Sequence, residues 1–390
     1  MKRKTTLIII VSIIVLVLAL IGYNFMRYLG DNLHEVVQRG NALFVRLSIL
    51  NGADVNECIP DKMRGPENDT TPLILAIQHN ANEKVIRHLL EAGADLNFIY
   101  DNGSSALFEA AESNSHPEII SLLVEAGASV HDSFTRIDAR EGTALMYAIL
   151  YNSPEVVQAL IDAGSDVNKK NRGGFTPLHA AIMSSSNARI VQALLQAGAD
   201  VSWRTPAGET PLHIVVTDDL AFINDEESDV PEIVSLFIEA GVDIHAKTKN
   251  GKTMLHYLAT NRDISVIEKV IAMVGSSIMK DPAIDASEYL LEAARANDNP
   301  DSIQFFIDMG ADINSRDGTQ RTALIVATEE NEILRSYHLE EGFTDIIGVL
   351  IAAGSDITAR DDRGMTAYDH LKKRFNDQVD TDPVWSKLKL

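Results

Sequence analysis

The sequence has a single cysteine and no excess of positive charge. With only Cys58 among 390 residues, no disulfide can form within the chain. Lysine and arginine number 34 against 56 aspartates and glutamates, which gives a formal net charge of −22 at pH 7. This balance argues against nucleic acid as a partner, because binding to the phosphate backbone requires basic surface. A strongly acidic surface either favours a basic partner or serves only solubility.

Short catalytic and nucleotide-binding motifs are also missing. The sequence contains no His-Glu-x-x-His, no paired cysteines and no glycine-rich phosphate loop. No serine lies in a Gly-x-Ser-x-Gly turn, and Gly173-Gly174 indicates a turn rather than a nucleotide site. The acidic stretch 225–229 lacks the alternating ligands and central glycine of a calcium loop. We therefore expect a protein that is not an enzyme, with no catalytic residues, metal, cofactor or small-molecule substrate.

Residues 5–26 predict a transmembrane signal anchor. An apolar run from Leu7 to Ile21, broken only by Ser12, continues to Met26 and reaches the roughly 20 residues that a spanning helix needs. No small-x-small cleavage site follows the run, so retention of the anchor is favoured over its removal as a signal peptide. Residues 1–4 carry three basic side chains and form a cytoplasmic stub, which places the rest of the chain across the membrane.

Residues 27–375 repeat one pattern, which is clearest at 176–202. A Thr-Pro-Leu-His-Ala-Ala start leads to a second apolar run that ends in Leu-Leu-Gln-Ala-Gly-Ala-Asp. Related starts occur at Thr71, Ser105, Thr143, Thr210, Thr253, Ser287, Thr322 and Thr366. Related endings occur at Gly52, Gly93, Gly127, Gly164, Gly198, Gly241, Gly310 and Gly354. Several of these glycines are 34 residues apart, close to the period of a known repeat class.

Each part of the pattern has a structural interpretation. The threonine hydroxyl caps a helix, and proline at the first helical position loses no hydrogen bond. The closing glycine ends a second helix in the left-handed conformation. A helix-loop-helix unit of this size cannot bury its own apolar face, so successive units must stack.

The pattern resembles the ankyrin repeat family over roughly residues 32–375. The resemblance implies an all-α solenoid of about ten helix-turn-helix units with β-turn fingers, preceded here by one transmembrane helix. It also implies protein binding rather than catalysis, and it gives His179, His213 and His256 a structural role between neighbouring turns. Residues 30–56 form an atypical capping unit, and residues 376–390 form a polar tail in which Val384 and Trp385 could pack on the last repeat.

The resemblance also predicts which side chains contact a partner. Alignment of the units places large side chains at finger tips and at the ends of first helices, where exposed apolar groups indicate binding. Some of them could instead fold back on neighbouring repeats. The candidates are Ile99, Tyr100, Phe134, Leu150, Tyr151, Phe175, Met183, Trp203 and Arg204.

Long insertions add acidic flanks to this surface. Two of them separate the first and second helices of their units, and they are expected to be solvated loops. Their acidic residues include Asp218, Asp219, Asp225, Glu226, Glu227, Asp229, Glu329, Glu330, Glu340 and Glu341. Two further insertions lengthen the fingers 57–70 and 132–142.

These features predict a membrane-anchored protein-binding module. Ankyrin repeats outside the cytoplasm favour a bacterial origin, with a single pass through the inner membrane and repeats in the periplasm. Some bacterial ankyrin proteins of this layout resemble immunity proteins, so the first hypothesis is an inhibitor that neutralises a basic toxin or effector enzyme. The alternative is an envelope scaffold or tether that inhibits nothing.

Overall fold

A computed structural model describes most of the chain after residue 32. The described ranges are 33–60, 69–79, 82–99, 105–113, 116–131, 133–135, 141–184, 187–217, 229–278, 285–330, 343–375 and 384–389. Within them, no helix combines the length and apolar character needed to cross a bilayer. The predicted anchor, residues 5–26, lies outside these ranges.

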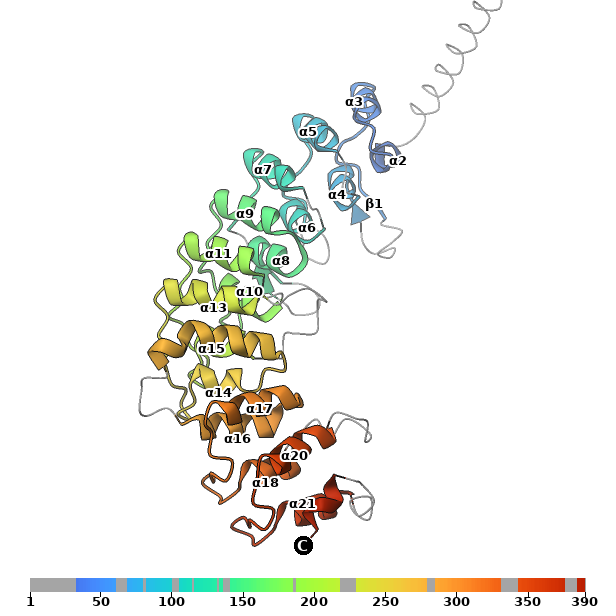
Figure 1. Cartoon of the computed structure of the whole chain (residues 1–390). Coiled ribbons are helices and arrows are strands. Elements are labelled where there is room, and N and C mark those ends of the chain that lie inside the picture. The colour runs from blue at the N-terminus through green and yellow to red at the C-terminus, as the bar shows by residue number, and fades with distance from the viewer. Residues whose placement is uncertain are drawn as a thin grey trace, which may run out of the picture. The chain divides into compact units, whose positions relative to one another are not determined.

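The described chain divides into two compact units. Figure 1 labels their helices and strands where there is room. Unit 1 comprises the residues up to Ala181 together with Gln196–Ala199, and unit 2 comprises Ile182–Leu195 together with everything from Asp200 onward. The helices α10 (Pro177–Ser184) and α11 (Ala188–Gln196) are divided between the two.

Helices dominate unit 1 and pack in two layers. The first helices of successive repeats contact one another, as do the second helices, and each first helix packs on its own second helix. This is the stacking that short amphipathic helices require to bury their apolar faces. The helices are α2 (Leu33–Gln38), α3 (Ala42–Leu50), α4 (Pro72–Gln78), α5 (Glu83–Glu91), α6 (Ala106–Ser113), α7 (Pro117–Glu125), α8 (Ala144–Tyr151) and α9 (Pro154–Asp162).

Unit 2 follows the same two-layer scheme. The long α15 and the short α12 and α14 depart most from the regular helix lengths. The elements are α12 (Pro211–Val215), α13 (Val230–Glu239), α14 (Met254–Leu258), α15 (Ile264–Ile278), α16 (Ala286–Ala296), α17 (Pro300–Asp308), α18 (Ala323–Glu330), α20 (Phe343–Ala352), α21 (Ala367–Phe375) and the 3-10 helix η2 (Trp385–Leu388).

Two long fingers contain β-hairpins, which the expected all-α class does not include. β1 (Ile59–Pro60) pairs antiparallel with β2 (Asp69–Thr70), and β3 (Ser133–Thr135) pairs with β4 (Glu141–Thr143). Both hairpins lie in the fingers that the sequence identifies as lengthened. The shorter fingers also pair across their turn, as where the Thr205 N–H donates to the Glu209 carbonyl oxygen at 3.0 Å, and the longer fingers extend such pairing into strands.

The expected helix starts and ends are present. The hydroxyls of Thr71 and Thr143 accept hydrogen bonds from the backbone N–H groups of Ile74 and Met146. All eight repeat-closing glycines have positive φ, from +82° at Gly241 to +105° at Gly127. At Gly198, where φ is +85°, an added Cβ would meet no atom within 4 Å, so the conformation rather than crowding requires glycine.

The repeats are also joined through the turns that follow these glycines. The Asn56 side chain donates to the Gly93 carbonyl oxygen at 3.1 Å and accepts from the Asp95 N–H at 2.8 Å. Asn168 donates in the same way to Gly198 at 3.0 Å. The asparagine in the Gly-x-Asp-x-Asn ending therefore links one turn to the next.

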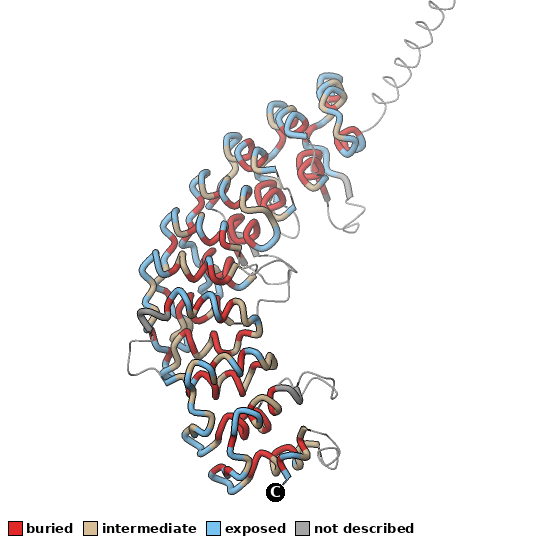
Figure 2. Tube along the Cα trace, viewed as in Figure 1, coloured by how far each residue is buried: buried red, intermediate tan, exposed pale blue. Residues whose placement is uncertain are grey.

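The core lies between the two layers of each unit. Figure 2 shows buried residues on the helix sides that face neighbouring helices and exposed residues at the connecting turns. At the end of the chain, Trp385 is 1% exposed and its ring lies 5.1 Å from that of Phe375. Part of the predicted polar tail therefore packs on the last repeat, which was the alternative for these residues.

Candidate functional site

Five of the predicted partner-binding side chains are large, apolar and exposed. They include Ile99 in a finger and Leu150 and Tyr151 at the end of α8. Tyr100 lies outside the described residues, and Phe134 lies in β3, opposite Gly142. The exposed fractions are 63% for Ile99, 40% for Leu150, 47% for Tyr151, 41% for Phe175 and 49% for Met183.

Three aromatic rings form a row along the first-helix layer of unit 1. Phe108 on α6 packs edge-on against Tyr147 on α8, with ring centroids 5.6 Å apart. Tyr147 in turn lies 6.2 Å from Tyr151, one helical turn further along α8. Phe108 and Tyr147 are buried, so the row leads from the core to an exposed ring. A partner that covers Tyr151 would extend an aromatic cluster that already exists.

Phe175 has a partly fixed position in its finger. Its ring lies edge-on to His179 at a centroid distance of 5.5 Å. A Cβ added at Gly173 would come within 2.9 Å of the Phe175 ring, so glycine at 173 leaves room for it. The ring is therefore held by its own repeat and still presents an exposed edge to solvent.

Trp203 corrects the sequence prediction, because it is only 8% exposed. It follows the closing glycine of its repeat by five residues, and the equivalent positions hold Ala246 and Ala359, which are 5% and 4% exposed. The finger itself turns later, where Gly208 N–H donates to the Thr205 carbonyl oxygen. Trp203 thus lies at the inward-facing base of a finger. The neighbouring Arg204 is exposed, as expected, and donates to the Gly208 carbonyl oxygen at 3.0 Å.

The three recurring histidines hydrogen-bond to the threonines that begin their helices. In each case Nδ1 accepts the backbone N–H of the threonine three residues earlier, at 3.0 Å for His179 and 3.1 Å for His213 and His256. Nε2 of His213 reaches the Lys252 carbonyl oxygen of the next finger at 3.2 Å. For His213, which contacts both its own threonine and the next finger, this geometry agrees with the structural role between turns that the resemblance implies.

The environment keeps these histidines neutral. Burial, aided by the positive charge of Lys170, lowers the pKa of His179 from 6.5 to about 4. Burial also lowers the pKa of His213 and His256, and it outweighs the hydrogen bonds to Lys252 and Glu288. A neutral Nδ1 has a free lone pair, which is what accepting the threonine N–H requires.

The acidic flanks also need correction where the structure describes them. Asp229 is not a solvated loop residue, because its Oδ2 accepts the Ala188 backbone N–H at 2.9 Å at the start of α11. Glu329 and Glu330 end α18 and are held by arginines of their own and neighbouring repeats. The remaining acidic candidates, namely Asp218, Asp219, Asp225, Glu226, Glu227, Glu340 and Glu341, lie outside the described residues.

Arg321 is the centre of this arrangement, which we call the charge network. Its guanidinium donates to Asp317 Oδ2 at 2.7 Å, to Glu329 Oε2 at 2.9 Å and to Glu330 Oε1. Burial alone would raise the pKa of Asp317, but hydrogen bonds from Arg321 and Thr319 outweigh it and lower the pKa to about 2. The pKa of Arg321 would be lowered by burial, and its three carboxylate partners raise it instead.

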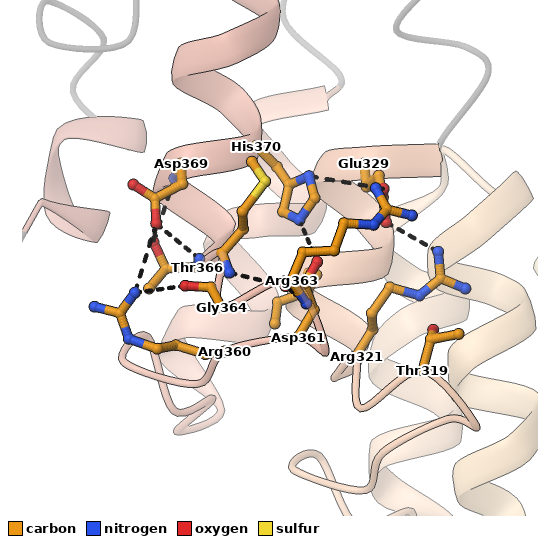
Figure 3. Close-up of polar contacts among 12 residues, drawn as sticks. Thr319, Arg321, Glu329, Arg360, Asp361, Arg363, Gly364, Thr366, Asp369 and His370 are labelled. Carbon is orange, nitrogen blue, oxygen red and sulfur yellow. Dashed lines mark hydrogen bonds and ion pairs between the residues drawn. The ribbon is translucent and has the colours of Figure 1, made fainter.

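The network extends to the repeats on either side, and Figure 3 shows its contacts with the last finger and α21. Arg295 on α16 donates to Glu330, and Arg363 in the last finger donates to Glu329 Oε1 at 2.8 Å. On α21, His370 Nε2 lies 2.9 Å from Asp361 Oδ2. The name charge network covers Arg295, Asp317, Arg321, Glu329, Glu330, Asp361, Arg363 and His370. Beyond it, Arg295 also pairs with Glu292, which in turn pairs with Lys252.

Glu329, Asp361 and His370 have the residue types of a metal site. Their ligand atoms lie within 4.8 Å of one another, and the site holds carboxylate and imidazole groups that bind zinc in other proteins. However, Arg321 and Arg363 already hydrogen-bond to Glu329, and Asp361 Oδ1 accepts the backbone N–H groups of Arg363 and Met365. The positive charges of these two arginines oppose the binding of a metal cation, so we interpret the three residues as part of the charge network.

The sequence pattern did not predict this network, although it carries a signal for it in the repeats of unit 2. Eight residues after the helix-starting positions 287, 322 and 366 lie Arg295, Glu330 and Arg374. These residues alternate in sign along successive first helices. In unit 1 the equivalent position after Thr143 holds Tyr151, so the same place carries an aromatic residue in one unit and charge in the other.

Comparison with known proteins agrees with the repeat pattern. Residues 33–134 and 131–204 match the family model that describes ankyrin repeats in three copies. A comparison with curated proteins gave no match. The match supports the ankyrin repeat family for residues 33–204, and ankyrin repeats imply a protein-protein interaction module.

Proposed function

We propose that this chain, whose residues 33–204 match the ankyrin repeat model, is a membrane-anchored inhibitor that neutralises a protein partner in the bacterial periplasm. The observation that carries the proposal is the exposed end of the aromatic row, Leu150 and Tyr151 on α8. Large apolar groups at the surface of a stacked repeat cost solubility, and they indicate a binding surface. Tyrosine is also among the residues that dominate binding energy at protein interfaces.

The contrast with unit 2 supports this assignment. There the ends of the first helices carry charged residues. Glu329 and Glu330 pair with arginines of their own and neighbouring repeats. Arg374 donates to the Thr328 carbonyl oxygen of the preceding repeat. Those side chains already have partners within the chain. In unit 1 the corresponding end of α8 carries Leu150 and Tyr151 instead, and their exposed apolar surface is available to a protein partner.

Removal of the exposed pair should abolish tight binding. We expect the double substitution Leu150→Ala and Tyr151→Ala to weaken partner binding by at least roughly a hundredfold, because interface anchors each contribute about 2 kcal/mol or more and 1.4 kcal/mol is about tenfold in affinity. The full-length chain in detergent would be used to capture partners from the envelope of its own organism. Captured proteins would be identified by mass spectrometry and titrated by calorimetry.

Ile238→Ala with Met273→Ala provides the matched control, since these residues are 36% and 45% exposed on the second-helix layer. A partner that binds the control variant and wild type equally, but not the Leu150 and Tyr151 variant, supports the proposed surface. Equal binding to all three chains would refute it. Adding the chain to the captured enzyme would then distinguish an inhibitor, which lowers activity, from a scaffold, which leaves it unchanged.

Cys58 provides a test of the proposed location. It is exposed and is the only cysteine in the chain, so a thiol reagent reports on this position alone. We expect a maleimide that cannot cross the inner membrane to label Cys58 in cells whose outer membrane has been made permeable. A Cys58→Ser chain should show no labelling. Labelling only after the inner membrane is lysed would place the repeats in the cytoplasm and overturn the proposed location.

A further inference from the structure

The second-helix layer of unit 1 contains an apolar groove between α7 and α9. Its volume is about 410 Å³, and its floor includes Pro117, Val124, Ala159 and Ala163. Pro117 and Val124 lie on the side of α7 opposite its buried face, which packs Ile119, Ile120, Leu122 and Leu123 into the core. The groove is therefore on the other layer of the unit from Leu150 and Tyr151, and it is separate from the surface proposed above.

The groove between α7 and α9, which we call the outer groove, has an acidic rim. Glu118, Glu125 and Asp162 line it and are exposed, and no lysine, arginine or histidine is among the lining residues. Within the described parts of the chain, none of the three carboxylates forms an ion pair. Asp162 accepts a hydrogen bond from Gln158 at 2.7 Å. The charge of Arg87 on α5 attracts that of Glu125, but its guanidinium donates a hydrogen bond to Glu83 Oε1 at 2.7 Å instead.

We propose that the outer groove binds an arginine-bearing segment of a protein partner. The aliphatic part of an arginine side chain packs on apolar surface while its charged end stays with polar groups, and this matches an alanine and proline floor with a carboxylate rim. The planar guanidinium forms paired hydrogen bonds with carboxylates, which a lysine ammonium cannot reproduce. The net charge of −22 adds long-range attraction for a basic partner.

The repeat pattern supplies a natural control for this site. Glu118 and Glu125 occupy the second and last positions of a helix that begins with proline. Glu232 and Glu239 on α13 also follow a proline and end their helix, and both are exposed. They do not line the outer groove. Carboxylates at equivalent helix positions can therefore be neutralised with or without the groove being altered.

The test uses the full-length chain with 13C-labelled alanine methyl groups in detergent. The probe is the peptide acetyl-Leu-Arg-Leu-amide, and its neutral twin carries citrulline in place of arginine. Signals of Ala159 and Ala163 are assigned from Ala159→Val and Ala163→Val chains. We expect the arginine peptide to shift both methyl signals in a saturable way, with at least about fivefold tighter binding than the citrulline peptide and a marked loss at high salt.

Variants then distinguish binding in the outer groove from nonspecific attraction of the arginine peptide to an acidic protein. The triple variant Glu118→Gln, Glu125→Gln and Asp162→Asn should weaken the arginine peptide by about tenfold, while Glu232→Gln with Glu239→Gln should bind like wild type. Equal shifts from both peptides, shifts confined to other alanines, or equal weakening in both variants would overturn the proposal. The Leu150→Ala and Tyr151→Ala variant, which removes the surface proposed above, should leave these alanine signals and their response to the arginine peptide unchanged. The two surfaces are therefore tested independently.

Discussion

Replacement of Trp203 by alanine is expected to lower the free energy of unfolding by about 3–5 kcal/mol, the range for truncating a buried aromatic residue. The side chain is 8% exposed at the base of its finger, so its removal leaves a cavity rather than a trimmed surface. Because repeat proteins unfold in segments, the loss should appear first around α12. Urea unfolding of the full-length chain, together with amide exchange near residues 200–216, would measure it.

Phe175→Ala is the matched control for Trp203→Ala. Phe175 also lies in a finger, but 41% of it is exposed, and its ring contacts its own repeat. We expect the Phe175 variant to unfold close to the wild-type midpoint. If Trp203→Ala leaves the midpoint and the exchange rates unchanged, the side chain is not part of the core. It would then return to the set of candidate binding residues.

Replacement of Arg321 by methionine is expected to be the most destabilising change in the charge network. The guanidinium side chain is 12% exposed and serves three carboxylates, so its loss leaves Asp317, Glu329 and Glu330 facing one another. Breaking a buried ion pair from one side costs about 3–5 kcal/mol, and partial exposure of Glu330 reduces this to about 2–3 kcal/mol here. Thermal unfolding and amide exchange in α18 and α21 would detect the loss.

The pH dependence of the same variant provides a second measurement. The pKa of Asp317 is about 2 in the folded chain, against 3.8 for an ordinary aspartate. A lowered folded-state pKa stabilises the fold above pH 3.8, and this stabilisation disappears as the pH falls toward 2. The wild-type midpoint should therefore drop between about pH 4 and 2. The drop should be smaller in the Arg321 variant, because Asp317 then loses the partner that lowers its pKa.

Two further chains make the Arg321 prediction specific. Combining Arg321→Met with Glu329→Gln and Glu330→Gln should recover part of the lost stability, since fewer unpaired charges remain. Arg87→Met removes an exposed pair with Glu83 and should leave the midpoint nearly unchanged. Equal effects from Arg321→Met and Arg87→Met would show that the charge network adds nothing beyond a surface ion pair.

The sequence was a good guide to features set by local geometry. A threonine cap acts on a backbone group three residues away, and a closing glycine acts through its own φ, so both were visible in the pattern. The role of His213 also follows from a threonine three residues before it. The candidate binding residues were predicted less well, because exposure depends on packing between repeats. The exposure of Leu150 and Tyr151 was confirmed, whereas that of Trp203 was wrong.

The sequence by itself determined the repeat unit, its helix boundaries and the positions that must be glycine, because these depend on residues close together in the chain. The tertiary structure alone decided which side chains meet across repeats. Arg295 and Glu330 pair across 35 residues, and Arg363 and Glu329 across 34. The same inter-repeat packing buries Trp203, leaves Tyr151 exposed and forms the groove between α7 and α9. Such contacts depend on how one repeat is placed on the next, and that placement is a property of the stacked core rather than of any local pattern.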